Sequence, residues 1–399
     1  MKIIIIGAGI SGLTLALACQ KAGMEVKIYE NAKKLRNIGG GLLLWPHGTR
    51  YLEWLGLSDC LQPYRVPVKR CNIVGTEGQT IFSEDYAAFY ALLGGQILPI
   101  DRSLLQQALV AKLPENILVT GKQCINIKTG PDAAEVTFAD GTTDSADLVI
   151  GADGIHSTVR NIINNKSELE YTNYCWWGGI IEQKDVPGLP ADEVFVAIGI
   201  GKMCIVWPTH GEKFMWYLPV KMTAAELARE GNGWSQLQDI CAGWHPEVEK
   251  IINAPGSTQR FHLPIYTLPP QQHWSSARVT LIGDAAHAIG PILGQGANLA
   301  IEDVFVLLHC LQQDSDNIFT KLERYETFRH ARARRLYELE TQSAAAMVND
   351  DIETLEAFQG QLPQLDLATI YQDLIPLIDE TACQELASAI LQDVRMVPA

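Results

Sequence analysis

The sequence predicts a mixed α/β fold: a Rossmann-like domain with a parallel sheet, interrupted by a mostly antiparallel β domain and followed by C-terminal helices. Residues 2–6 form a continuous apolar run, after which come a glycine turn, an apolar helical segment and a second strand at 25–30. This strand–helix–strand order is typical of parallel strands covered by helices. Residues 171–274 contain short aromatic or β-branched runs between Pro and Gly turns, which indicate antiparallel strands.

The first domain is predicted to be discontinuous, because buried strands at 147–150 and 278–282 return to its sheet. Helical stretches fill 297–313 and 318–348, and the remaining C-terminal residues are helical and amphipathic. The predicted boundaries are 1–70, 98–170 and 276–345 for the first domain, 71–97 and 171–275 for the β domain, and 346–399 for the C-terminal helical segment.

Composition excludes several classes of protein. The chain has 399 residues, 47% of them hydrophobic and 19% charged, and its formal net charge is −15. It is too apolar to be disordered, and its negative charge argues against binding to nucleic acid. No uncharged apolar run is long enough for a membrane span, and the run at 2–6 is too short for a signal peptide.

The nine cysteines are scattered, without a Cys-x-x-Cys pair or a Cys/His cluster of zinc spacing. This pattern predicts reduced thiols and neither a disulfide scaffold nor a structural metal. Reduced thiols are typical of cytoplasmic proteins, and we expect this location. We also expect a monomer or a homodimer.

The glycine turn after the first strand indicates a dinucleotide site. Gly7 permits the tight turn, Gly9 lets the backbone approach a pyrophosphate, and Gly12 lets helix and strand pack closely. A pyrophosphate is attracted to the N-terminus of the following helix. Glu30 closes the second strand, where a carboxylate can accept hydrogen bonds from a ribose. This turn does not distinguish NAD from FAD.

Two later segments distinguish them. Residues 148–160 contain Gly-Ala-Asp-Gly, and residues 281–303 contain Gly-Asp-Ala-Ala-His followed by Gly-Gln-Gly-Ala-Asn. With 35–46, 101–104 and 325–335, these segments resemble the class A FAD-dependent aromatic monooxygenases, the p-hydroxybenzoate hydroxylase superfamily. Within it, the sequence is similar to salicylate-hydroxylase-like and zeaxanthin-epoxidase-like members.

The resemblance implies an FAD site. Asp284 would hold hydroxyls of FAD, although an Asp after a strand can also cap a helix. The helix after Gly294 would face the flavin N1–O2 edge and stabilise negative charge there. Asp153 is equally consistent with ordering its own turn. Arg102 would contact a phosphate or the flavin, with a surface charge as the alternative. The predicted FAD-binding residues are Gly7, Gly9, Ser11, Gly12, Glu30, Asn31, Arg36, Gly41, Leu43, Arg102, Cys124, Asp153, Asp284, Pro291, Gly294, Gly296, Ala297 and Asn298.

The resemblance also implies a reaction. NADH or NADPH reduces FAD transiently, the reduced flavin takes up O2, and a flavin hydroperoxide inserts one oxygen atom into a small substrate. The alternative is an FAD-dependent oxidase or dehydrogenase that inserts no oxygen. Residues 1–345 carry the resemblance, and it does not choose between hydroxylation and epoxidation.

The substrate is expected between the flavin and the β domain. Met215 and Tyr217 share one face of a strand and, with Met203, suit a largely apolar aromatic or polyene substrate; an ordinary sheet core is the alternative. The strands contain no basic cluster for a carboxylate. His47, with Tyr217, is the candidate base or relay, unless His47 caps its helix or faces solvent. The arginines at 329, 332 and 335 are expected to pair with acids on their own helix.

Overall fold

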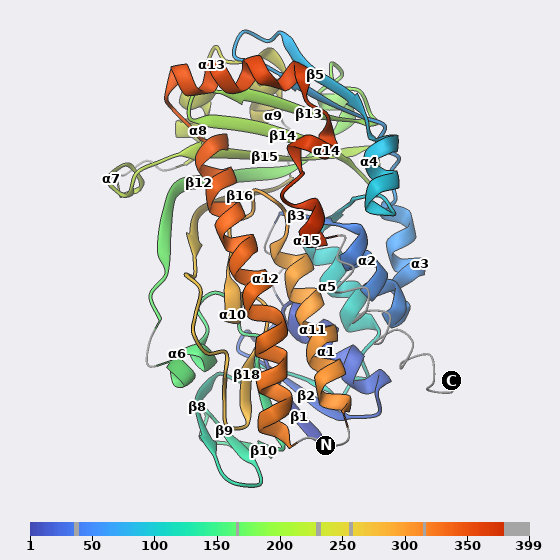
Figure 1. The fold of residues 1–399 in the computed structure, drawn as a ribbon, viewed down its shortest axis with the longest axis vertical. Helices are drawn as coiled ribbons and strands as arrows, with labels where there is room; N and C mark the ends of the chain where they lie inside the picture. Colours follow the sequence, from blue (N-terminus) through green and yellow to red (C-terminus); the bar gives the residue numbers. More distant parts are fainter. Residues whose placement is uncertain (36–39, 165–166, 229–232, 255–257, 314–316, 379–399) are drawn as a thin grey trace.

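The computed structural model describes residues 1–35, 40–164, 167–228, 233–254, 258–313 and 317–378. Two large sheets lie toward opposite ends of the molecule, with long helices between them (Figure 1). The N-terminus lies at the end that holds the parallel sheet. Arg36 lies outside the described residues.

The first sheet has six strands in the order β17-β18-β11-β1-β2-β7. Its central strand β1 is buried on both faces because Ile3, Ile4 and Ile5 are fully buried. All neighbours pair in parallel except β17 with β18. The strands are β1 (Lys2–Ile6), β2 (Glu25–Glu30), β7 (Leu118–Thr120), β11 (Leu148–Gly151), β17 (Ser275–Ser276) and β18 (Val279–Leu281).

The second sheet has seven strands in the order β16-β12-β15-β14-β13-β4-β5. Its pairs are antiparallel, except that β13 and β4 are parallel. The strands are β4 (Arg70–Val74), β5 (Thr80–Asp85), β12 (Glu170–Glu182), β13 (Glu193–Gly199), β14 (Lys202–Thr209), β15 (Lys213–Lys221) and β16 (Thr258–Thr267).

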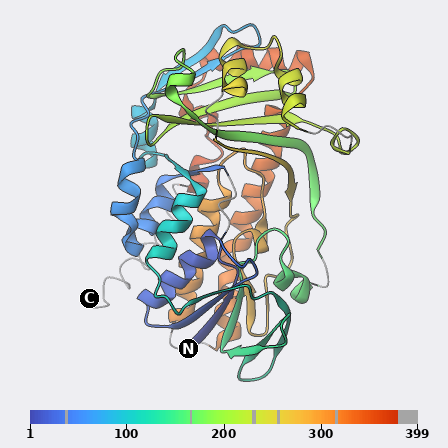
Figure 2. The same ribbon diagram turned by 180° about the vertical axis from the view of Figure 1, so that it is seen from behind.

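The two faces of this second sheet belong to different cores. Phe214 and Trp216 face outward and pack with α8 (Trp234–Cys241) and α9 (Pro246–Asn253), the yellow helices in Figure 2. Met215 and Tyr217 face inward and join the core of the parallel sheet. The alternation of side chains along β15 thus separates the two cores, as the sequence predicts.

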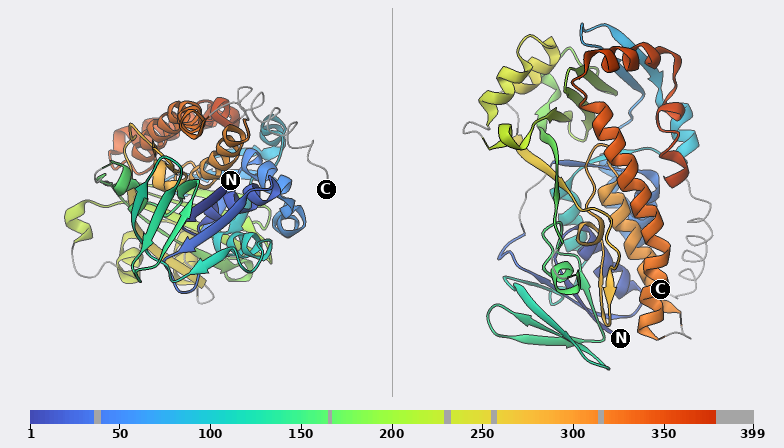
Figure 3. Two further views of the ribbon diagram at one scale, coloured as in Figure 1. Left: turned by 90° about the horizontal axis from the view of Figure 1, so that it is seen from below. Right: turned by 60° about the vertical axis from the view of Figure 1, so that its left-hand side comes forward.

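Helices connect the two sheets. The longest, α12 (Ile318–Met347), runs along the molecule from one sheet to the other (Figure 3). Helix α11 (Gly296–Gln312) packs against it, and α1 (Ile10–Lys21) packs against α11. The other helices are α2 (Pro46–Leu52), α3 (Ser58–Leu61), α4 (Tyr86–Leu93), α5 (Arg102–Ala111), α6 (Thr158–Asn164), α7 (Ala224–Leu227), α10 (Asp284–His287), α13 (Ile352–Gln361), α14 (Leu367–Ile370) and α15 (Ile375–Ile378), with short π or 3-10 turns at Glu53–Leu57, Gln62–Tyr64, Gln183–Asp185 and Leu362–Gln364.

Two small sheets complete the fold. β3 (Gly41–Leu44) pairs with β6 (Leu98–Asp101), and β8 (Cys124–Thr129), β9 (Ala134–Phe138) and β10 (Thr143–Ala146) form a three-stranded sheet. The predicted fold class is confirmed, whereas the predicted domain boundaries stay a prediction. No helix in the described part of the chain is long and apolar enough to cross a membrane.

Candidate active site

The turn between β1 and α1 is built around glycines. A Cβ on Gly7, whose φ is +107°, would lie 2.3 Å from the Ala152 carbonyl oxygen, and one on Gly12 would lie 2.1 Å from that of Gly7. Side chains are therefore excluded at both positions. Gly9 has no neighbour within 4 Å of its Cβ position and supplies no side-chain cap to α1. The first N–H groups of α1 thus remain available to an anion.

Glu30 holds this turn at the end of β2. Its Oε2 accepts from the Ala8 N–H at 2.9 Å, and its Oε1 accepts from the Ala32 N–H at 2.8 Å. A carboxylate has about four lone-pair sites, so Glu30 keeps capacity to accept ribose hydroxyls. Gln106 of α5 supports the same turn because its Nε2 donates to the Ala8 carbonyl at 2.8 Å.

A second turn, after β18, lies against the first. Gly283 has a φ of +60°, and a Cβ there would lie 3.0 Å from Ser11 Oγ. Gly283 is the residue that caps α10, whereas Asp284 is the first helical residue and its side chain is exposed. An exposed carboxylate needs no ionic partner, unlike a buried one. Gly283 therefore brings the start of α10 close to Ser11 in the first turn of α1.

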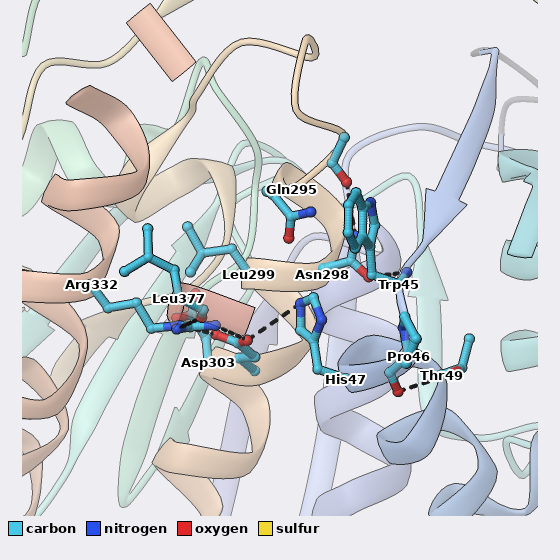
Figure 4. Close-up of polar contacts among 12 residues, drawn as sticks. Trp45, Pro46, His47, Thr49, Gln295, Asn298, Leu299, Asp303, Arg332 and Leu377 are labelled. Carbon is cyan, nitrogen blue, oxygen red and sulfur yellow. Dashed lines mark hydrogen bonds and ion pairs between the residues drawn. The ribbon is translucent and has the colours of Figure 1, made fainter. Parts of the chain in front are cut away.

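Asn298 joins a third element, β3, to the start of α11. Its side chain is fully buried, and Nδ2 donates to the carbonyls of Leu43 at 2.9 Å and Gly294 at 2.8 Å. The Trp45 N–H donates to its Oδ1 at 3.0 Å (Figure 4). The helix has no side-chain cap at Gln295, so its first N–H groups lie open beside β3.

His47 points away from β3 into a buried cluster of charges. Its Nε2 lies 3.5 Å from Glu302 Oε1, and both Arg329 and Arg332 bind the Glu302 carboxylate. Burial lowers the pKa of His47 to about 4, so the imidazole is neutral at pH 7. Burial alone would raise the pKa of Glu302, but the two arginines lower it to about 2.

The charge cluster continues to the turn after β18. Asp303 accepts from Arg329 Nε at 2.7 Å and from the Gly283 N–H at 2.8 Å, and His287 Nε2 lies 2.5 Å from it. The expectation that the arginines pair within their own helix is wrong for Arg329 and Arg332, which bind acids of α11. The expectation holds for Arg335, whose Nη1 lies 3.7 Å from Glu338 Oε2 on the same helix.

The inward face of the second sheet meets β3 at Gly41. A Cβ on Gly41 would lie 2.0 Å from Met215 Sδ and 2.6 Å from the Tyr217 hydroxyl. The Tyr217 oxygen is buried without a hydrogen-bond partner in the described structure. Burial, and then the charge of Asp101, raises the pKa of Tyr217, so its hydroxyl stays protonated. Met203 is buried on the same inward face.

The structure brings most of the predicted residues into one continuous region. Gly7, Gly9, Ser11, Gly12, Glu30 and Asp284 surround the first turns of α1 and α10, and Gly41, Leu43, Gly294, Gly296, Ala297 and Asn298 lie where β3 meets α11. The loop containing Pro291 leads from α10 to α11. This donor set fits a dinucleotide extending from the glycine turn to β3.

Other predicted residues lie at the margins of this region. Asp153 accepts from the Thr158 and Val159 N–H groups and so caps α6. Cys124 is buried on β8, and burial raises the pKa of its thiol to about 12. Asn31 is exposed after β2, and the Arg102 N–H donates to the Gly40 carbonyl at 3.3 Å.

Two aromatic residues of the region are absent from the predicted site residues, although Trp45 lies in the segment 35–46 that carries the resemblance. The Trp45 Nε1 is buried without a hydrogen-bond partner in the described structure, and it lies 3.7 Å from a Cβ placed on Gly294. The Phe261 ring on β16 lies 2.4 Å from a Cβ placed on Gly40. A buried indole N–H without a partner is a sign of a ligand contact, but only the fold shows it. No sequence signal pairs residues so far apart.

Comparison with known proteins gives consistent matches over most of the chain. A family model described as "FAD binding domain" matches residues 1–340. The chain is 32% identical over 355 residues to 3-amino-4-hydroxybenzoate 2-monooxygenase of Streptomyces cremeus, with 85% of this chain and 87% of the relative covered. It is 30% identical over 368 residues to the FAD-dependent urate hydroxylase of Klebsiella pneumoniae, with 91% and 94% covered.

A solved structure agrees with these matches. Klebsiella pneumoniae HpxO complexed with FAD and uric acid superimposes with a TM-score of 0.87 at 27% identity, covering 95% of this chain and 96% of that one. The similarity therefore extends over both large sheets and the helices that join them.

Proposed function

Because this chain belongs to the class A family of FAD-dependent monooxygenases, we propose that it inserts one oxygen atom of O2 into a small, largely hydrophobic aromatic or polyene substrate. The protein is a flavoprotein monooxygenase that uses FAD, with NADH or NADPH as the reductant. The family does not determine the substrate, so we infer its chemical character from the residues of this chain.

The apolar inward face of the second sheet carries the proposal. Strand pairing places Ile205 and Gly178 beside Tyr217, and Trp207 and Ile180 beside Met215. Where the central strands β12–β15 pair, the inward positions between the strand ends are apolar apart from the hydroxyls of Tyr174 and Tyr217: Tyr174, Trp176, Gly178, Ile180, Val194, Val196, Ile198, Met203, Ile205, Trp207, Met215, Tyr217 and Pro219.

In the described central strands β12–β15, the charged side chains of this face stand at the strand ends. Lys213 and Glu182 end their strands, lie 3.7 Å apart and are substantially exposed. Lys202 points to the opposite face, where it donates to the Ile240 carbonyl. The two relatives are named for 3-amino-4-hydroxybenzoate and urate, which are polar. A face without an inward charge would desolvate such substrates without compensation, and it favours an apolar one.

Different residues of the chain would bind the cofactor, stabilise negative charge on its ring and bind the substrate. The α1 N-terminus, Glu30 and Asp284 would hold the dinucleotide, and the open α11 N-terminus would stabilise negative charge on the ring beside it. FAD itself supplies the electron transfer and the oxygen transfer. Tyr217, which stays protonated, would donate a hydrogen bond to a substrate oxygen, and the apolar face would exclude water.

A substrate panel tests the proposal. The flavin-loaded protein is incubated with NADH or NADPH under 18O2, with 2-naphthol as an apolar ring and with 3-amino-4-hydroxybenzoate and urate as polar ones. We expect NAD(P)H consumption and one 18O atom in the product for the apolar ring. Faster turnover of either polar compound would refute the substrate class. Oxidation of the substrate with formation of hydrogen peroxide, and with no 18O in the product, would instead identify an oxidase.

A further inference from the structure

Glu340 is a buried acid that the function described above does not use. It lies on α12, its side chain is 2% exposed, and its carboxylate faces the loop between α10 and α11. Oε1 accepts from the Ile292 N–H and Oε2 from the Leu293 N–H, both at 2.8 Å. These bonds attach α12 to the loop that ends at Gly294 and the α11 N-terminus.

No cation compensates this carboxylate within the described residues. The loop from Ile289 to Gln295 contains no charged side chain. The titratable group that faces Glu340 is Tyr174 of β12: a Cβ on Gly290 would lie 2.5 Å from Glu340 Oε1 and 2.7 Å from the Tyr174 hydroxyl. Burial, followed by the nearby Glu340 charge, raises the pKa of Tyr174, which therefore stays neutral.

An uncompensated buried carboxylate costs several kcal/mol, which two backbone hydrogen bonds offset only in part. Burial raises the pKa of Glu340 to about 7, against the two N–H groups that lower it. The ionised form accepts on both oxygens, whereas the protonated form turns one oxygen into a donor. Protonation therefore weakens the bond from one of the two loop N–H groups, because the hydroxyl oxygen of a carboxylic acid is a poorer acceptor than a carboxylate oxygen.

We propose that Glu340 is a positioning residue that holds the flavin-facing loop through its ionised carboxylate, so that FAD binding and proton binding at Glu340 oppose each other. The inference rests on the proposed placement of the flavin beside this loop. By linkage, FAD affinity then falls as Glu340 takes up its proton.

FAD titration of the apoprotein by flavin fluorescence tests this at pH 6, 7 and 8. We expect the Kd of the wild type to rise about tenfold from pH 8 to pH 6, the upper limit being tenfold per pH unit below the pKa. Glu340→Gln should bind FAD about tenfold more weakly at pH 8 and show no such pH dependence. Glu338→Gln, an exposed acid two residues away on the same helix, should keep the wild-type profile.

Two further measurements keep the outcomes distinct. If Glu340→Gln does not fold, the wild type alone decides, because FAD binding at pH 6.5 must release protons in calorimetry with buffers of different ionisation enthalpy. No proton release, or an unchanged profile in folded Glu340→Gln, would overturn the inference. Asp284→Ala should weaken FAD binding at every pH; if it does not, the placement of the cofactor fails instead.

Discussion

Burial fixes the protonation state of His47. The ring is 11% exposed, and its one charged neighbour within ion-pair distance, Glu302, is already bound by two arginines. A pKa of about 4 means that the folded protein binds this proton far more weakly than the unfolded chain, whose histidine has a pKa near 6.5. The contribution to stability is therefore complete above pH 6.5 and is lost as the pH falls toward 4.

This predicts an acid-sensitive contribution of His47 to stability. Between pH 7 and pH 5 the wild type should lose about 2 kcal/mol of unfolding free energy through His47. The carboxylates of Glu302 and Asp303 have lowered pKa values and stay ionised in this window. Urea unfolding of the wild type and His47→Asn at both pH values measures the difference. Equal losses in the two proteins would show that His47 does not titrate as described.

Asp284 differs from His47 because its side chain is exposed. If it accepts hydrogen bonds from FAD hydroxyls, Asp284→Ala should raise the Kd for FAD roughly tenfold to a hundredfold, since a charged hydrogen bond contributes about 1.5–3 kcal/mol. Asp59→Ala removes another exposed first-turn aspartate, in α3, and should leave the Kd unchanged. Matching Kd values for the two variants would remove Asp284 from the site.

At the scale of elements, α11 is the centre of the site. Its N-terminal turn is bound to β3 through Asn298, and its middle is bound to α12 through Glu302 and Asp303. One helix thus connects the strand expected at the flavin with the longest helix of the molecule. A change at either contact would move the helix start relative to β3.

Loss of the Asn298 contacts should be costly. Asn298→Ala leaves two carbonyls and one N–H buried without partners, for which we expect a loss of about 2–4 kcal/mol in unfolding free energy. FAD binding should weaken as well. Asn317→Ala removes the exposed N-cap of α12, should cost about 1 kcal/mol and should spare FAD binding. Chemical denaturation and FAD titration of both variants check this; an equal cost for the two would contradict it.

The elements that the sequence predicts are those with local signals. The apolar run of β1, the glycine turn and the long helices α11 and α12 all follow from periodicity and turn residues. β3 and β6 lie more than fifty residues apart, and no local pattern predicts their pairing. The same holds for Arg329, whose partners lie on another helix, and for Asn298, whose side chain binds β3.

On the scale of the whole molecule, the proposed substrate region is a seam between the second sheet and the small β3–β6 sheet. Neither sheet forms it alone: the second sheet contributes Met215 and Tyr217, and the small β3–β6 sheet contributes Gly41. Because Gly41 lacks a side chain, the two layers approach closely at this point. The size of the side chain at position 41 therefore controls the distance between β3 and β15.

A double-mutant cycle tests this dependence. The Cβ of Gly41→Ala would lie 2.0 Å from Met215 Sδ, so the methionine must move into the seam, and we expect the KM for the best substrate of the panel to rise roughly tenfold. Met215→Ala removes the two nearest clashing atoms, at a cost of about 2–5 kcal/mol in stability, and should restore the KM in part in the double variant, because the Tyr217 hydroxyl at 2.6 Å remains. Gly360→Ala, in a helix with no atom near its Cβ position, should leave the KM unchanged and slightly stabilise the protein. Strictly additive effects of Gly41→Ala and Met215→Ala would show that the two residues do not meet in the seam.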